Sequence, residues 1–311
     1  MSEKLLANVL QRLKEASKMA AWMQWRALGA TASSAKPAVA LVDPEALVLL
    51  SLALAEEERR LWDLLGWWAR VGCQILSVQR IKNLAGAYPE AVRSKLGQFA
   101  HLALSEGGDF RWKPLARSQP AKTIRLKKSL GDRLTLTEPS ALLLRLRMGF
   151  GVGMKADILG FLLGMQGAWA STRQITEATS YTAQAIRRAL EDMATARFLE
   201  ATSETPAKYR VDPSGWADFL GLSGGLPAWR YWPPVFAFVA DLVDWARRDI
   251  SVERSPYILS SRARDLFEHH QRAFTWNQIT IPIPDDFPGD KYLQAFEETL
   301  NKIAHWLEER V

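Results

Sequence analysis

Apolar residues recur every three or four positions along most of this chain, which is the spacing of an amphipathic helix. Near the start, Leu6, Leu10 and Leu13 share one helical face, and charged residues stand between them. Comparable patterns predict further helices at residues 47–72 (one helix or a pair), 77–88, 89–104, 140–148, 234–248, 260–274 and 290–310. The chain is therefore predicted to be mainly α-helical.

Breaking residues divide this pattern into segments. Asp43-Pro44-Glu45 is typical of a helix start, Tyr88-Pro89 separates two helices, and Gly107-Gly108 ends the first helical region. We expect four parts, which are a helical N-terminal domain (1–112), a basic linker with a lead-in helix (113–154), a compact unit (155–212) and a helical C-terminal region (213–311).

The compact unit has the most informative pattern. A first helix begins near Lys155, Ser171-Thr172 caps a second helix, and Ser180-Tyr181 forms a tight turn. Thr182 caps a third helix, predicted to run to residue 199 with four apolar residues facing inward, which are Ala183, Ile186, Leu190 and Met193. Residues 198–200 and 208–211 are then expected to pair as a short hairpin around Pro206.

The exposed face of the third helix carries side chains that can contact DNA. Gln184, Arg187 and Arg188 lie near its start, where a recognition helix presents groups to the major groove. Arginine pairs with guanine edges and glutamine with adenine, and both also hold phosphate. On the hairpin, Lys208 and Arg210 are placed to contact phosphate or the minor groove.

The run STRQITEATSYTAQAIRRALEDMATARFLE resembles the helix-turn-helix of winged-helix transcriptional regulators of the MarR, ArsR and GntR type. The resemblance covers about residues 155–212 and departs from the common pattern at Ser180, where glycine is usual, and at Arg197 and Phe198, where glycine and leucine are frequent. It implies a multi-helical protein with a central winged helix-turn-helix and a small β-hairpin wing. It also implies that Thr172, Tyr181 and Thr182 join the DNA-contacting residues.

The positive charge lies just upstream of this unit. The formal net charge is +6, but residues 113–154 alone contain nine basic and two acidic residues, whereas residues 155–212 contain seven of each. Arg125, Lys127 and Lys128 could therefore form an arm that holds phosphate without reading sequence. The alternative is a charged, solvated linker.

Other candidate chemistry is weaker. Cys73 is the one cysteine of the sequence, which excludes an intramolecular disulfide framework, and Gly149–Lys155 matches no phosphate-loop spacing. His269-His270 are adjacent, so we expect them on different helix faces, as surface or helix-end residues, and predict no metal site. With no catalytic pattern either, we expect neither an enzyme nor a cofactor.

The sequence thus predicts a sequence-specific DNA-binding transcriptional regulator whose partner is double-stranded DNA. The flanking helices would supply homodimerisation and a site for a small-molecule or protein effector. No apolar run has the length of a membrane span, and the N-terminal residues lack a signal-peptide pattern, so we expect a cytoplasmic protein. The alternatives are a protein–protein assembly module that uses the winged helix as its surface, and a nucleic-acid-processing component.

Overall fold

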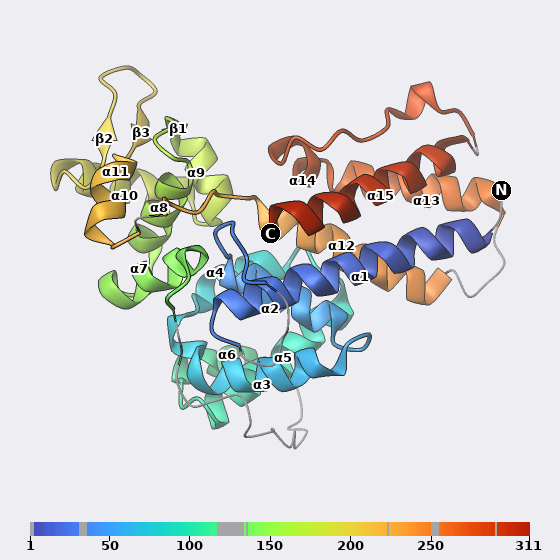
Figure 1. Cartoon of the computed structure of the whole chain (residues 1–311), viewed down its shortest axis with the longest axis horizontal. Helices are drawn as coiled ribbons and strands as arrows, with labels where there is room; N and C mark the ends of the chain where they lie inside the picture. The colour runs from blue at the N-terminus through green and yellow to red at the C-terminus, as the bar shows by residue number, and fades with distance from the viewer. Residues whose placement is uncertain are drawn as a thin grey trace.

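The computed structural model describes residues 3–30, 36–116, 134, 136–222, 224–249, 255–289 and 291–311. These residues are mainly helical, which confirms the predicted class, and their strands form one small sheet (Figure 1). The helices are α1 (Glu3–Ala27), α2 (Pro44–Leu54), α3 (Arg59–Val71), α4 (Val78–Ala85), α5 (Glu90–Ser105), α6 (Lys113–Ala116), α7 (Leu142–Phe150), α8 (Met154–Gly164), α9 (Thr172–Thr179), α10 (Ala183–Thr195), α11 (Pro213–Phe219), α12 (Trp232–Asp249), α13 (Pro256–His269), α14 (Gln271–Trp276) and α15 (Lys291–Arg310). None of them combines the length and the apolar character needed to cross a membrane.

Helices from both ends of the chain share the larger hydrophobic core. α1 packs along α15, and α2 packs against α12 (Figure 1). Large side chains fill the space between these helices, among them Trp25, Trp68, Phe236 and Phe296, all fully buried. The helices predicted for residues 1–112 and those predicted after residue 230 therefore form one packed body.

A second, smaller core lies between α7, α8, α9 and α10, on the side of the molecule away from α13 (Figure 1). Strands β1 (Ala170–Ser171), β2 (Glu200–Ala201) and β3 (Lys208–Arg210) close it as an antiparallel sheet in the order β1-β3-β2. Ala170 faces Tyr209, and Glu200 faces Arg210 across the sheet. The predicted pairing of two short strands is confirmed, but the first strand is Glu200–Ala201 instead of residues 198–200, and β1 had not been predicted.

Capping residues begin the helices where the sequence indicates. The Asp43 carboxylate accepts a hydrogen bond from the Ala46 N–H at 3.1 Å and so begins α2. The Ser171 hydroxyl and the Gln174 side chain form a reciprocal capping box at the start of α9. Pro89 separates α4 from α5, and residues 47–72 form a pair of helices, α2 and α3.

The third helix of the compact unit differs from its prediction in two respects. α10 ends at Thr195 because Arg197 adopts a left-handed backbone with φ 59°, which reverses the chain before β2. Ala183 is exposed, contrary to the prediction, because the first residue of α10 lies beyond the edge of the smaller core. Ala189 is buried instead and packs in that core with Ile186.

Candidate functional site

The N-terminal half of α10 presents three polar side chains to solvent. Thr182 begins the helix, and its hydroxyl accepts a hydrogen bond from the Ala185 N–H at 3.4 Å. Gln184, Arg187 and Arg188 are exposed as predicted, because the opposite face of α10 packs into the smaller core. These side chains are therefore free to contact a ligand that lies along the start of the helix.

The charge on α10 is divided between its two halves. In the part of the chain that the structure describes, neither Arg187 nor Arg188 forms an ion pair with a carboxylate. Asp192, one turn further along, is paired with Lys155 at 2.8 Å, while Glu191 is exposed. The start of α10 is therefore cationic, and its acidic residues lie toward the C-terminal end.

The two basic residues predicted for the hairpin differ in their surroundings. Arg210 donates two hydrogen bonds to Glu200 Oε2, at 2.8 and 2.9 Å, and its guanidinium lies 4.5 Å from the centre of the Trp169 ring. Its charge is thus used to hold β3 to β2. Lys208 is exposed on the same strand, so it is the hairpin residue best placed to contact a phosphate.

Some of the predicted site residues lie elsewhere. The Tyr181 hydroxyl donates to Asp157 Oδ2 at 2.9 Å and lies 3.1 Å from Ser77 Oγ, so it faces the interior of the molecule. Burial and the nearby Asp157 carboxylate raise the pKa of Tyr181. Thr172 is half-buried in the first turn of α9. The predicted phosphate-binding arm lies outside the described residues, and its members are Arg125, Lys127 and Lys128.

A buried set of charged side chains connects the two cores. We call it the junction network, and its five members are Asp43, Glu45, Arg80, Arg147 and Asp157. Arg80 donates to both Asp43 and Glu45, the latter at 2.7 Å. Arg147 donates to Glu45 at 2.6 Å and to Asp157 at 2.7 Å. Three carboxylates thus share two guanidinium groups, and the hydroxyl of Tyr181 supplies a further donor.

Arg80 of the network and Asn83, both on α4, also fix the turn between α9 and α10. Arg80 Nε donates to the Thr179 carbonyl oxygen at 3.1 Å, and Asn83 Nδ2 donates to the Ser180 carbonyl oxygen at 2.8 Å. Ser180 itself has a left-handed backbone with φ 59°. The start of α10 is therefore held in a defined position relative to α4 and the larger core.

Acid should weaken this junction. Burial disfavours the charged form of Glu45, but Arg147 and Arg80 outweigh it and hold the pKa of Glu45 at about 2, below the value of 4.5 for a free side chain. A lowered pKa stabilises the folded state above pH 4.5, and this contribution is lost as the pH falls toward 2. Urea unfolding at several pH values should show this loss, and Glu45→Gln should flatten the dependence. An equal acid dependence in Glu45→Gln would contradict the assignment.

Sequence reasoning missed one further cluster. Asp241, His269 and His270 place their potential ligand atoms within 4.8 Å of one another. The predicted surface or helix-end position is confirmed, because α13 ends at His269 and His269 is exposed. The expected divergence of the two side chains is not found, because the backbone turns at His270 and the ring centres lie 4.7 Å apart. Adjacent side chains diverge by about 100° only on a continuous helix.

Two features thus remain as candidate sites. One is the cationic start of α10 together with Lys208, and the other is the cluster around His269. The first is supported by a rigid junction, and the second by the meeting of α12 with α13 and α14. No protein-family model, no curated protein and no solved structure matches this chain.

Proposed function

We propose that residues 155–212 form a winged helix-turn-helix and that the protein is a sequence-specific DNA-binding transcriptional regulator. The order α8, β1, α9, α10, β2, β3, with β3 between the other two strands, supports this proposal. The backbone at Ser180 and Arg197 supports it too. The regulators that this segment resembles commonly have glycine at these two positions, and in this chain both residues adopt the left-handed conformation that glycine favours.

One observation carries the proposal above the others. Arg187 and Arg188 project, without a salt bridge among the described residues, from the start of a helix whose position is fixed by buried contacts. A helix inserted in the major groove reads bases with its N-terminal residues, and a helix whose backbone is already held in place does not have to be ordered on binding. Gln184 would contact adenine, the arginines guanine or phosphate, and Thr182 and Lys208 the backbone.

Affinity must come in part from outside this unit, because residues 155–212 contain equal numbers of basic and acidic residues. We propose that the basic segment with Lys127 and Lys128 adds phosphate contacts, and that two copies bind a symmetric site. The helical body would provide the dimer contacts and an effector site, and the protein would act in the cytoplasm.

The test is a selection of bound fragments from random duplex DNA, followed by titration of the enriched sequence. Arg187→Ala/Arg188→Ala should lose about 100-fold or more in affinity, since each bidentate base contact contributes about 1–3 kcal/mol. The matched control is Arg59→Ala/Arg60→Ala, another adjacent exposed pair, on α3. No enriched sequence, or equal losses in both double variants, would contradict the proposal.

A second function is favoured by one specific observation. Four aromatic side chains form edge-to-face or tilted contacts 5.7–6.4 Å apart beside α10, and three of them are exposed; they are Phe150, Phe198, Trp216 and Phe219. Exposed aromatic clusters are typical of protein–protein contacts. The double variant Phe150→Ser/Phe219→Ser should then abolish self-association or partner binding. If it does so, and the unaltered protein binds no DNA, a protein–protein assembly function replaces the proposed DNA-binding function.

A further inference from the structure

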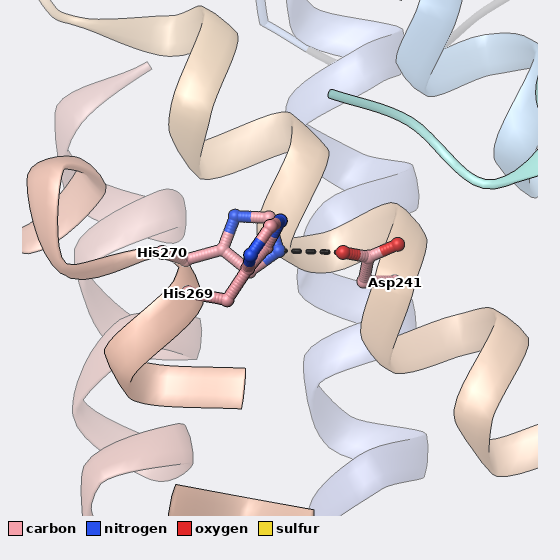
Figure 2. Close-up of side chains that lie close together, drawn as sticks. All are labelled: Asp241, His269 and His270. Atoms are coloured by element: carbon pink, nitrogen blue, oxygen red, sulfur yellow. Dashed lines mark hydrogen bonds and ion pairs between the residues drawn. The ribbon is translucent and has the colours of Figure 1, made fainter. Parts of the chain in front are cut away.

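We propose that Asp241, His269 and His270 form a binding site for a divalent transition-metal ion, with Zn²⁺ as the best match. Figure 2 shows the three side chains converging from α12 and from the junction of α13 with α14. His270 Nε2 lies 2.6 Å from Asp241 Oδ2, and the His269 and His270 rings have centres 4.7 Å apart. This site is independent of the proposed DNA-binding function.

The backbone explains how two adjacent histidines can face one ion. His269 is the last residue of α13, and His270 has φ −103° and ψ 19° before α14 begins. The two rings are almost perpendicular, at 86°, so their nitrogens approach a common point from different directions. His270 is buried and packs edge-on against Phe238, which fixes its orientation, whereas His269 is exposed and free to adjust.

The charge of Asp241 is not balanced by a neighbouring lysine or arginine among the described residues. A surface hollow beside His269 and Asp241 is also lined by two acid–base pairs, Asp244 with Arg248 and Asp265 with Arg262. Those two carboxylates are compensated by arginine. Among the described residues, Asp241 forms an ion pair only with His270 and with no lysine or arginine, so a bound divalent ion would supply the missing positive charge.

The donor set selects the class of metal. Two imidazoles and one carboxylate suit Zn²⁺ and related transition metals, whereas Mg²⁺ and Ca²⁺ require a set of oxygen ligands. With Zn–N bonds of about 2.0 Å, ligand atoms of a tetrahedral site are about 3.3 Å apart. The present spacing is at most 4.8 Å, and it reaches this value if the exposed His269 rotates inward while the metal ion replaces the hydrogen bond between His270 Nε2 and Asp241 Oδ2, which are now 2.6 Å apart. Three protein ligands leave a fourth position for water or an exogenous ligand.

The experiment is a Zn²⁺ titration of untagged, chelator-treated protein against a chromophoric chelator, with Co²⁺ absorption as a second readout of tetrahedral coordination. We expect one Zn²⁺ per chain and a raised melting temperature when Zn²⁺ is added. His269→Gln and Asp241→Asn should each weaken binding at least 10-fold. Asp241→Asn keeps the size and polarity of the side chain, and His269→Gln alters an exposed residue, so we expect both variants to fold.

The control is His305→Gln on α15, where His305 lies near Glu308 and Glu309 and is the histidine most able to bind metal adventitiously. His305→Gln should bind Zn²⁺ as the unaltered protein does. Absence of Zn²⁺ binding in the unaltered protein, binding that survives both His269→Gln and Asp241→Asn, or loss in His305→Gln alone would each overturn the site.

Discussion

Replacing Arg147 with methionine is expected to lower the free energy of unfolding by about 3–5 kcal/mol, a large part of the stability of an ordinary domain. Arg147 is fully buried and holds both Glu45 and Asp157. Methionine fills a similar volume but leaves three buried carboxylates with Arg80 as the one remaining guanidinium of the network. Urea unfolding followed by tryptophan fluorescence measures the loss.

Two further variants make this prediction specific to the network. Arg145 lies on the same helix, is only half-buried and donates to the Leu220 carbonyl oxygen at 2.6 Å, so Arg145→Met should cost about 1 kcal/mol. Adding Asp157→Asn to Arg147→Met should restore part of the lost stability, because one unpaired charge is removed. Equal losses in Arg145→Met and Arg147→Met would show that packing rather than charge is the cause.

Gly107→Ala is the second substitution with a large expected effect, about 3 kcal/mol of destabilisation, at the upper end for an overpacked core. A methyl group on Gly107 would lie less than 3.0 Å from the carbonyl oxygens of Ala69 and Ala103 and from Cys73 Sγ. Two of these atoms belong to the backbones of α3 and α5, so relief of the clash requires the helices to separate. Thermal unfolding of both proteins measures the difference.

The control for this substitution is Gly149→Ala near the end of α7, where an added methyl group meets no heavy atom within 4 Å. Alanine is the better helix former, so this variant should be as stable as the unaltered protein or slightly more stable. If Gly107→Ala behaved in the same way, the close approach of α3 and α5 at this glycine would be refuted.

Local signals in the sequence were enough to place many of the elements. Asp43, Ser171 and Thr182 begin their helices as predicted, because a short polar side chain that caps free N–H groups acts within three residues of itself. The exposure of Arg187 and Arg188 follows from helical periodicity in the same way. Ala183 was misplaced because periodicity gives a direction around the helix and does not show where the neighbouring core ends.

The junction network and the histidine cluster could not be predicted, for different reasons. Arg80 and Arg147 resemble solvated arginines of amphipathic helices, and their acidic partners lie as many as 102 residues away in the chain. Tyr181 was placed on the surface for the same reason, since Asp157 and Ser77 are distant in sequence. At His270 the helix breaks without proline or glycine, so nothing nearby indicated that the two rings converge.

The packing of α1 against α15 joins two segments that lie far apart in the sequence. Contacts of such high sequence separation are expected to form late in folding, because the long loop between them must first be closed, so the larger core should be completed only when α15 docks on α1. The smaller core is drawn almost wholly from residues 142–229 and can form earlier. Until α15 docks, α1 has only its smaller contacts with α2 and α12, so part of its apolar stripe is expected to stay exposed in the folding chain.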